Sequence, residues 1–200
     1  MNENILRVLT TIIFLTGIGI SVYFRRKADR DSGERVSYKD EGRPMFLILR
    51  LGGLLLWLSA FAYLINPAWM DWSRVNAPGW VRWTGVGVGI LCDILLYWMF
   101  TSIGQGITPT VATRKSHKLV THGIYKYVRH PLYSIGTAFF LSFALMAANW
   151  FFAGMAILAF MMLAIRLPNE EAHLIEKFGD EYREYTKRTG KFLPKIGGTQ

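Results

Sequence analysis

One stretch of the chain carries most of the side chains that could bind a charged ligand. It runs from His117 to Tyr133, reads H-K-L-V-T-H-G-I-Y-K-Y-V-R-H-P-L-Y, and contains three of the four histidines. A second polar cluster, R-L-P-N-E-E from Arg166 to Glu171, follows one apolar hairpin later. Together the two clusters offer imidazole, guanidinium, phenol and carboxylate groups. Such a set could hold a cationic cofactor that carries its own amino and carboxylate groups, and we expect the clusters to form one site.

The surrounding chain has the composition of a membrane protein. It is 52% apolar and only 18% charged, whereas about 25% charged residues is usual in soluble domains. Long apolar runs alternate with short basic loops. The net charge of +9 comes from lysines and arginines that flank these runs without forming a dense tract, which argues against nucleic acid binding. The single cysteine, Cys92, excludes a disulfide framework and a cysteine-based metal site.

The apolar runs predict an all-α integral membrane protein with five transmembrane helices. About twenty apolar residues are enough to cross a ~30 Å hydrocarbon core. The expected spans are 5–24, 45–65, 80–103, 132–148 and 150–167.

Pro168 and the spacing of apolar residues after it predict the structure of the C-terminal part of the chain. Pro168 is expected to end or kink the fifth helix. The tail, 169–200, is expected to form an amphipathic helix because its apolar residues recur at helical spacing. We therefore divide the chain into three N-terminal helices (1–103) with a loop at 25–45, and a candidate catalytic region (104–200) that contains the hairpin 132–167.

Loop charges predict the orientation. The 25–45 loop has seven basic residues, the 104–131 loop five, and the segment from 166 onward seven, whereas 66–79 and Asn149 have one between them. The positive-inside rule then places the N-terminus outside and the C-terminus, with its amphipathic helix, in the cytoplasm. Both polar clusters fall on the cytoplasmic side, and the hairpin returns the chain to its starting face. Residues near 125–133 and 166–171 are therefore expected to be neighbours.

The pattern of the two clusters resembles a known enzyme family. The run L-V-x-x-G-I-Y-x-x-V-R-H-P-x-Y, an apolar hairpin, and then E-E-x-x-L-I-x-x-F-G-x-E-Y-x-x-Y with a closing proline is similar to the isoprenylcysteine carboxyl methyltransferases. The phospholipid N-methyltransferases share much of it. The resemblance covers about residues 115–195. It implies an integral membrane enzyme that uses S-adenosylmethionine, with S-adenosylhomocysteine as product, outside any Rossmann fold.

The resemblance also implies roles for individual residues. Arg166 would face the substrate carboxylate, and Arg166, Glu170 and Glu171 are the expected catalytic residues. In the best-known family members a glutamine contacts the cofactor a few residues before the H-x-L-V run, where this chain reads Thr-Pro-Thr-Val at 108–111. The residues expected around the cofactor are His117, Lys118, Leu119, Val120, Tyr125, Arg129, His130, Pro131, Leu132, Tyr133 and Glu170.

The chemistry is consistent with these residue types. Methyl transfer from a sulfonium is an in-line displacement that neutralises charge, so the protein mainly supplies orientation. An ionised carboxylate needs no general base, and Arg166 could fix its direction through two hydrogen bonds. An amine substrate would need a base such as Glu171 or His130.

The expected function is methylation of the carboxylate of an isoprenylated cysteine, with the lipid-like substrate entering laterally from the bilayer and the cofactor from the cytoplasm. The nearest alternative is a phosphatidylethanolamine N-methyltransferase. A sterol-type membrane reductase and a non-enzymatic lipid-binding protein are further alternatives. Structural roles are also possible: Arg129-His130-Pro131 as a basic helix start, Glu170-Glu171 as complements to a helix dipole, and Arg166 as a residue that reaches the interface.

Three further features were interpreted from their position in the chain. Gly85, Gly87 and Gly89 mimic the glycine-rich turn of soluble methyltransferases but lie inside a predicted span, so Gly85 and Gly89 are interpreted as a close helix-packing face. Asp93 is costly within the same span and is expected to be functional or paired, with Arg50 as a candidate partner. The histidines form neither H-E-x-x-H nor histidine boxes, so no metal site is expected.

Overall fold

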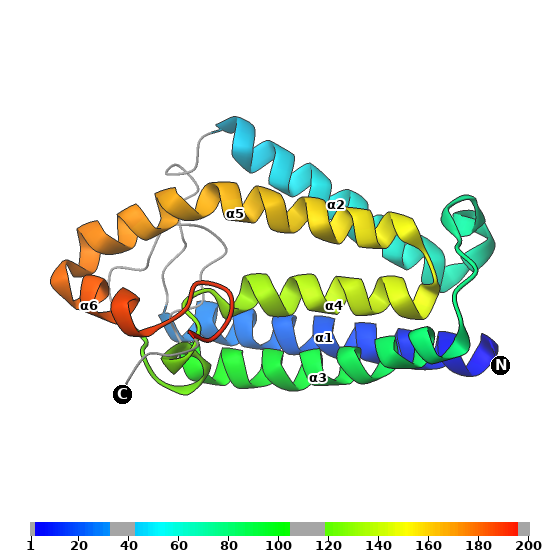
Figure 1. Ribbon diagram of the computed structural model, residues 1–200, viewed down its shortest axis with the longest axis horizontal. Coiled ribbons are helices and arrows are strands. Elements are labelled where there is room, and N and C mark those ends of the chain that lie inside the picture. The colour runs from blue at the N-terminus through cyan, green and yellow to red at the C-terminus, as the bar shows by residue number, and fades with distance from the viewer. Residues whose placement is uncertain (1–2, 33–42, 105–118, 196–200) are drawn as a thin grey trace.

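Apolar helices that run lengthwise beside one another make up most of the structure (Figure 1). The computed structural model describes residues 3–32, 43–104 and 119–195. Helices α2 and α5 lie over α4, which packs in turn on α1 and α3. The elements, in chain order, are α1 (Glu3–Ser32), α2 (Arg43–Ile65), η1 (Pro67–Ser73), α3 (Gly79–Ile103), η3 (Gly123–Lys126), α4 (Pro131–Ala147), α5 (Trp150–Phe178) and α6 (Asp180–Arg188).

Three helices in the described part of the chain are long and apolar enough to cross a bilayer. They comprise Glu3–Asp31, Gly79–Ile103 and Trp150–Phe178. The other two, Arg50–Ile65 and Pro131–Ala147, are apolar but shorter. The all-helical, integral membrane architecture predicted from the sequence is therefore confirmed, whereas length and composition support three of the five expected spans.

Two helices are longer than the sequence predicted. Helix α1 continues through Arg25, Arg26 and Lys27 to Ser32, because no proline or glycine interrupts this stretch and arginine, lysine and alanine are good helix formers. Helix α5 continues through Pro168 to Phe178, so the proline does not end it. A proline removes only one backbone donor, and the turns on either side remain helical.

The sequence predicted one amphipathic helix over 169–200, but the described part of this tail is divided between two helices. Its first ten residues belong to α5, and Gly179, with a φ of 58°, separates them from α6. A positive φ is accessible to glycine without steric cost. The break turns the chain back, so that α6 packs against α5.

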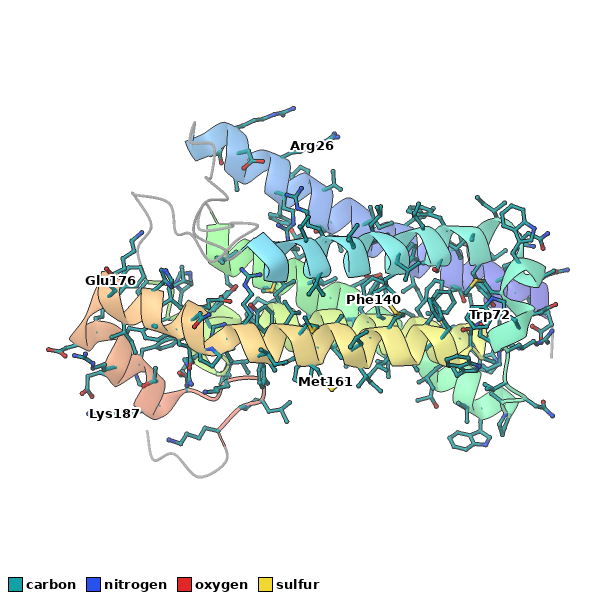
Figure 2. All side chains as sticks on the ribbon, turned by 90° about the horizontal axis from the view of Figure 1, so that it is seen from above. Arg26, Trp72, Phe140, Met161, Glu176 and Lys187 are labelled. Atoms are coloured by element: carbon teal, nitrogen blue, oxygen red, sulfur yellow. The ribbon has the colours of Figure 1, made fainter. Side chains whose placement is uncertain are left out.

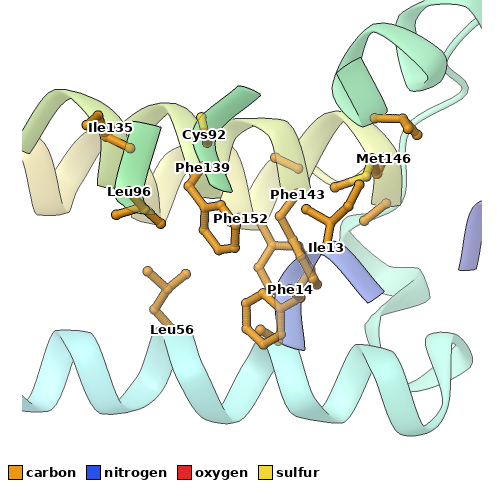
Figure 3. Packing of buried hydrophobic residues seen from close by; sticks show 14 of the residues in the cluster. Ile13, Phe14, Leu56, Cys92, Leu96, Ile135, Phe139, Phe143, Met146 and Phe152 are labelled. Carbon is orange, nitrogen blue, oxygen red and sulfur yellow. The ribbon is translucent and has the colours of Figure 1, made fainter. Parts of the chain in front are cut away.

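Aromatic side chains from α1, α4 and α5 pack against one another within the core (Figure 3). Phe14 of α1 is fully buried, and its ring centroid lies 5.0 Å from that of Phe143 on α4. Phe143 lies 4.8 Å from Phe152 on α5 in an edge-to-face arrangement. Aromatic pairs of this geometry stabilise a core by about 0.5–1.5 kcal/mol beyond their buried area. The cluster fixes the α4–α5 hairpin against α1.

Glycines in α3 allow α4 and α1 to approach closely. A Cβ on Gly85 would lie 2.9 Å from the Met146 nitrogen and the Ser142 carbonyl oxygen, and one on Gly89 would lie 2.9 Å from Ile13. No atom of the described residues lies within 4 Å of a Cβ on Gly87. The interpretation of Gly85 and Gly89 as a packing face is therefore confirmed.

Polar side chains hold the turns at the N-terminal end of the bundle. Arg7 donates to the carbonyls of Leu64 (2.9 Å) and Ile65 (2.6 Å) at the end of α2. Asn149 accepts from the Phe151 amide at the start of α5 and donates to the Met70 carbonyl at 3.1 Å. These bonds satisfy backbone groups that helix ends leave unpaired, and they fix the tight turn between α4 and α5.

Asp93 is buried in the middle of α3. Its Oδ1 would lie 2.9 Å from a Cβ on Gly17 of α1, beside Phe139 of α4. Among the described residues, the Asp93 Oδ1 atom has no hydrogen-bond partner, and its pairing with Arg50 stays a prediction.

Candidate active site

Segment η3 brings the first polar cluster against the end of α3. Gly123 has a φ of 59°, and a Cβ there would lie 2.1 Å from the Ser102 Oγ. Only glycine fits both the backbone conformation and the space. Tyr125 follows in η3, and its carbonyl accepts a 2.6 Å hydrogen bond from the Tyr185 hydroxyl of α6. Burial raises the pKa of the Tyr125 phenol, and neighbouring Tyr185 and Glu170 raise it further, so Tyr125 remains a neutral hydroxyl.

The start of α4 and the last third of α5 meet at the same end of the bundle. The Tyr133 hydroxyl donates to Glu170, and the Arg129 Nε donates to Glu171 at 3.1 Å. His130 lies between the carboxylates, with Nδ1 3.5 Å from Glu170 and Nε2 3.5 Å from Glu171. The prediction that the two clusters are neighbours is therefore confirmed. We call these five residues the carboxylate cluster.

These contacts favour the charged form of His130. Its side chain is only 5% exposed. Burial lowers the pKa of His130, but the facing Glu170 and Glu171 carboxylates outweigh burial and leave the pKa above its ordinary value of 6.5. A charged imidazole between two carboxylates keeps both acids ionised side by side.

Glu171 is bound by three cationic side chains. Besides Arg129 and His130, Lys191 places its Nζ 3.3 Å from Glu171. The Arg129 side chain is 7% exposed, and its Nη1 donates to the carbonyls of Thr186 (3.2 Å) and Thr189. Arg129 thus connects α5 to the end of α6. In contrast, Glu170 has Tyr133 and His130 as its neighbours, and the charge of Arg166, one turn earlier on α5, acts on it.

The segment after α6 closes one side of the cluster, which the sequence did not predict. The amides of Arg129 and His130 donate to the carbonyls of Gly190 (2.9 Å) and Lys191 (3.1 Å), and the Gly190 amide donates to Tyr127. Phe192 packs between Tyr133 and Phe160. A Cβ on Gly190 would lie 1.7 Å from the Leu193 carbonyl oxygen. In the sequence, the signal that could have indicated this close packing was Gly190, which follows Tyr182 and Tyr185 of α6.

The remaining predicted residues are distributed around this cluster. Pro131 is buried and begins α4, and Leu132 packs against the core beside it. Leu119 and Val120 precede η3 and are half-buried. His117, Lys118 and the stretch 108–111 lie outside the described residues. Within the described part of the chain, no group of three His, Cys, Asp or Glu side chains could hold a metal ion.

Sequence and structure comparisons agree on the relatives of this chain. A sequence model of the phospholipid methyltransferase family matches residues 80–181. Protein-S-isoprenylcysteine O-methyltransferase B of Arabidopsis thaliana is 32% identical over 145 residues, covering 68% of this chain and 74% of the relative. The chain belongs to the isoprenylcysteine carboxyl methyltransferase family. It is a membrane methyltransferase, and the family match extends upstream of the two clusters to include α3.

Two further relatives support the assignment. The O-methyltransferase of Schizosaccharomyces pombe is 30% identical, covering 78% of this chain and 70% of the relative. The human enzyme is 31% identical, covering 64% of this chain, which spans only 46% of the human protein. Among solved structures, the eukaryotic intramembrane Ras methyltransferase superposes with a TM-score of 0.59 over 96% of this chain and 70% of the other, at 22% identity. That likeness establishes the fold.

Proposed function

We propose that this methyltransferase transfers a methyl group from S-adenosylmethionine to the carboxylate of an isoprenylated cysteine at the carboxylate cluster. The observation that carries the proposal is the meeting of Tyr133 on α4 with Glu170 on α5, next to Arg166. It places an anion and a guanidinium one helical turn apart at the end of the apolar bundle. The relatives in plants, yeast and human all bear the name O-methyltransferase, which favours a carboxylate over an amine acceptor.

The chemistry of the cluster fits a sulfonium cofactor with an amino-acid end. Glu170 provides an ionised oxygen for a cationic group, and Tyr125, Tyr133 and His130 provide neighbouring donors. We propose that these residues, with Leu119, Val120, Pro131 and Leu132, hold the cofactor, and that His117 and Lys118 join them. When bound, S-adenosylmethionine supplies the methyl carbon, which a carboxylate oxygen attacks as the carbon–sulfur bond breaks and sulfur keeps the electron pair.

Arg166 is the residue proposed to orient the acceptor. It lies on α5 one turn before Glu170 and is partly buried. A guanidinium binds a carboxylate through two parallel hydrogen bonds, which fixes the direction of the attacking oxygen. Such orientation contributes roughly 7–11 kcal/mol to barrier reduction in well-aligned systems.

Glu171 and Arg129 are proposed to act as positioning residues. Three cationic side chains surround Glu171, and Arg129 is bonded to Glu171 and to two carbonyls. An ionised carboxylate acceptor needs no general base, so Glu171 need not accept a proton. It instead fixes Arg129, which in turn fixes the segment after α6.

The chemical identity of the product distinguishes the two candidate acceptors. Full-length protein in detergent would be supplied with methyl-labelled S-adenosylmethionine and either N-acetyl-S-farnesylcysteine or phosphatidylethanolamine. We expect label in farnesylcysteine as a methyl ester, which mild base releases as methanol. Base-stable label in phosphatidylethanolamine would instead identify an amine methyltransferase.

Two variants separate the proposed roles. Arg166→Ala should raise the KM for farnesylcysteine while leaving the calorimetric Kd for S-adenosylmethionine nearly unchanged, and Glu170→Ala should do the reverse. His173→Ala is the matched control on α5, because His173 is exposed and, within the part of the chain that the structure describes, its ring bonds to the Asn169 carbonyl one turn away. Equal losses of both quantities in the two variants would refute these assignments.

We further propose that the carboxylate cluster faces the cytoplasm and the N-terminus the opposite side. Residues 104–200 would then form the catalytic region, supported by helices within 1–103, and the prenyl chain would enter laterally from the bilayer. The excess of basic residues in alternate loops supports this orientation.

Cysteine labelling can test the orientation because the one native cysteine, Cys92, is buried. Trp72 and Glu176 lie at opposite ends of the bundle (Figure 2). A membrane-impermeant maleimide added to intact cells should label Trp72→Cys and not Glu176→Cys. The opposite pattern would reverse the proposed orientation.

A further inference from the structure

A polar pocket lies at the end of the bundle away from the carboxylate cluster. It has a volume of about 440 Å³ and is lined by Glu3, Arg74, Val75, Asn76, Ala77, Arg82 and Ala148. The pocket is formed by the starts of α1 and α3, the loop after η1, and the α4–α5 turn. Its volume lies within the range of small-ligand sites, roughly 300–1,000 Å³.

The pocket lies at the level of the opposite membrane interface. Ser102 lies beside η3, at the end of the bundle that holds the carboxylate cluster. Arg82 is twenty residues before it on α3, which corresponds to about 30 Å at 1.5 Å per residue. That length equals the hydrocarbon thickness of a typical bilayer. Figures 1 and 2 show η1 and Trp72 at this end and α6 at the other. Exposed tryptophans surround the level of the pocket, as in an interfacial belt: Trp69, Trp72, Trp80, Trp83 and Trp150.

Arg82 provides the pocket with a nearly buried guanidinium that hydrogen bonds hold in place. Its side chain is only 7% exposed, although arginine is seldom buried without a partner. Its Nε donates to the Met146 carbonyl at 2.9 Å and its Nη1 to the Glu3 Oε1 at 2.6 Å. Among the described residues, these are its two side-chain hydrogen bonds. Two bonds leave the guanidinium with further donors in a residue that lines the pocket.

Arg74 and Glu3 complete the charge pattern. Arg74 lines the same pocket, and among the described residues its ion pair is a long, exposed contact of 4.0 Å with Asp71, so it can bind another anion at little cost. Glu3 is 55% exposed and offers its second oxygen. The pocket therefore presents two guanidiniums and one carboxylate, which complement a phosphate joined to an ammonium group.

We propose that this pocket binds the headgroup of an aminophospholipid from the opposite leaflet, with the phosphate against Arg74 and Arg82 and the ammonium toward Glu3. The position at the interface and the tryptophans around it favour a lipid over a water-soluble phosphate ester. The site is separate from the carboxylate cluster and does not depend on the methyl acceptor.

Native mass spectrometry of the full chain in detergent tests the proposal. Dioleoylphosphatidylethanolamine should form a saturable one-to-one adduct, and dioleoylphosphatidylglycerol should bind more weakly. Arg74→Gln should weaken the first adduct about tenfold, the change expected when one charge-assisted hydrogen bond is lost. Arg183→Gln is the matched control, because Arg183 is equally exposed and also pairs with an aspartate three residues earlier, on α6.

Further arms distinguish the possible ligands and sites. Water-soluble glycerophosphoethanolamine should compete with the lipid at millimolar concentration, and its failure to compete would refute headgroup recognition. Equal binding of the two lipids, or equal binding by Arg74→Gln and Arg183→Gln, would overturn the proposal. Loss of the adduct in Glu170→Ala, with Arg74→Gln unaffected, would assign the lipid to the carboxylate cluster instead. Arg74→Gln is preferred to Arg82→Gln because Arg82 also holds the end of α4.

Discussion

The Tyr133 hydroxyl donates a hydrogen bond to the Glu170 carboxylate, although the two residues are 37 positions apart in the sequence. Tyr133 lies in the first turn of α4, and Glu170 lies in α5 beyond Pro168. The bond therefore closes the α4–α5 hairpin at its open end. It also gives Glu170 a fixed direction, since the Tyr133 ring stacks on His130 at 5.6 Å.

Removal of that hydroxyl tests the role of Glu170. Tyr133→Phe keeps the ring on His130 but removes the hydroxyl donor of Glu170, which leaves His130 beside the carboxylate. We expect the affinity for S-adenosylmethionine to fall about tenfold, because a hydrogen bond to a charged group contributes roughly 1.5–3 kcal/mol. Isothermal titration calorimetry would measure the change. Tyr97→Phe, at an exposed tyrosine of α3, should bind like the original protein, and an unchanged Kd in Tyr133→Phe would contradict the assignment.

Glu171 should matter for stability more than any exposed acid. In Glu171→Ala the nearly buried Arg129 loses its carboxylate, and breaking such a pair typically lowers the free energy of unfolding by about 3 kcal/mol or more. Glu184→Ala breaks an exposed pair with Lys187 and should cost no more than about 0.5 kcal/mol. Thermal unfolding of both variants in the same detergent gives the comparison. Similar midpoints would show that the Arg129–Glu171 pair does not hold the fold.

Stability should decline as pH rises above the ordinary pKa of histidine. The pKa of His130 is raised above 6.5 in the folded chain by Glu170 and Glu171. A raised folded-state pKa means that the stabilising charge is fully present below pH 6.5 and is lost as the pH rises through the folded value. His130→Gln has no such charge to lose, so its unfolding midpoint should vary less between pH 6.5 and 9. Parallel curves for the two proteins would exclude this titration.

The packing of α3 on α4 can be tested with two glycines of one helix. Gly85→Ala places a Cβ 2.9 Å from backbone atoms of α4 and should destabilise the bundle by about 1–3 kcal/mol, as overpacking does. Gly87→Ala meets no atom of the described chain within 4 Å and should be neutral or stabilising by up to about 1 kcal/mol, because alanine favours the helix. The two unfolding midpoints should differ in opposite directions. Equal effects would mean that helix propensity, and not contact, governs this position.

Hairpin geometry explains why the meeting of the two polar clusters could be predicted from sequence alone. Apolar segments before and after Asn149 return the chain to its starting face, so the segments that carry Tyr133 and Glu170 come to lie at the same end of the bundle. The glycine pair of α3 could be predicted for the same reason, since spacing alone assigns it to one helix face.

Other features depended on contacts that no local pattern encodes. The continuation of α5 through Pro168 is such a case, because a proline signal indicates a probable helix end and not a certain one. The pairing of Gly190 and Lys191 with Arg129 and His130 joins segments about 60 residues apart through backbone atoms. Arg82 carried no sequence signal beyond its place at a helix start, yet it holds the end of α4.

The shortness of α4 has a consequence for substrate handling. At seventeen residues it is about 26 Å long, slightly less than the depth of the apolar layer. In the proposed orientation, Tyr133 and Glu170 would therefore lie close to the level where acyl tails give way to water. An isoprenoid attached to cysteine could stay dissolved among those tails while its terminal acid reached Arg166, so the enzyme would not have to extract a greasy chain into water in order to esterify it.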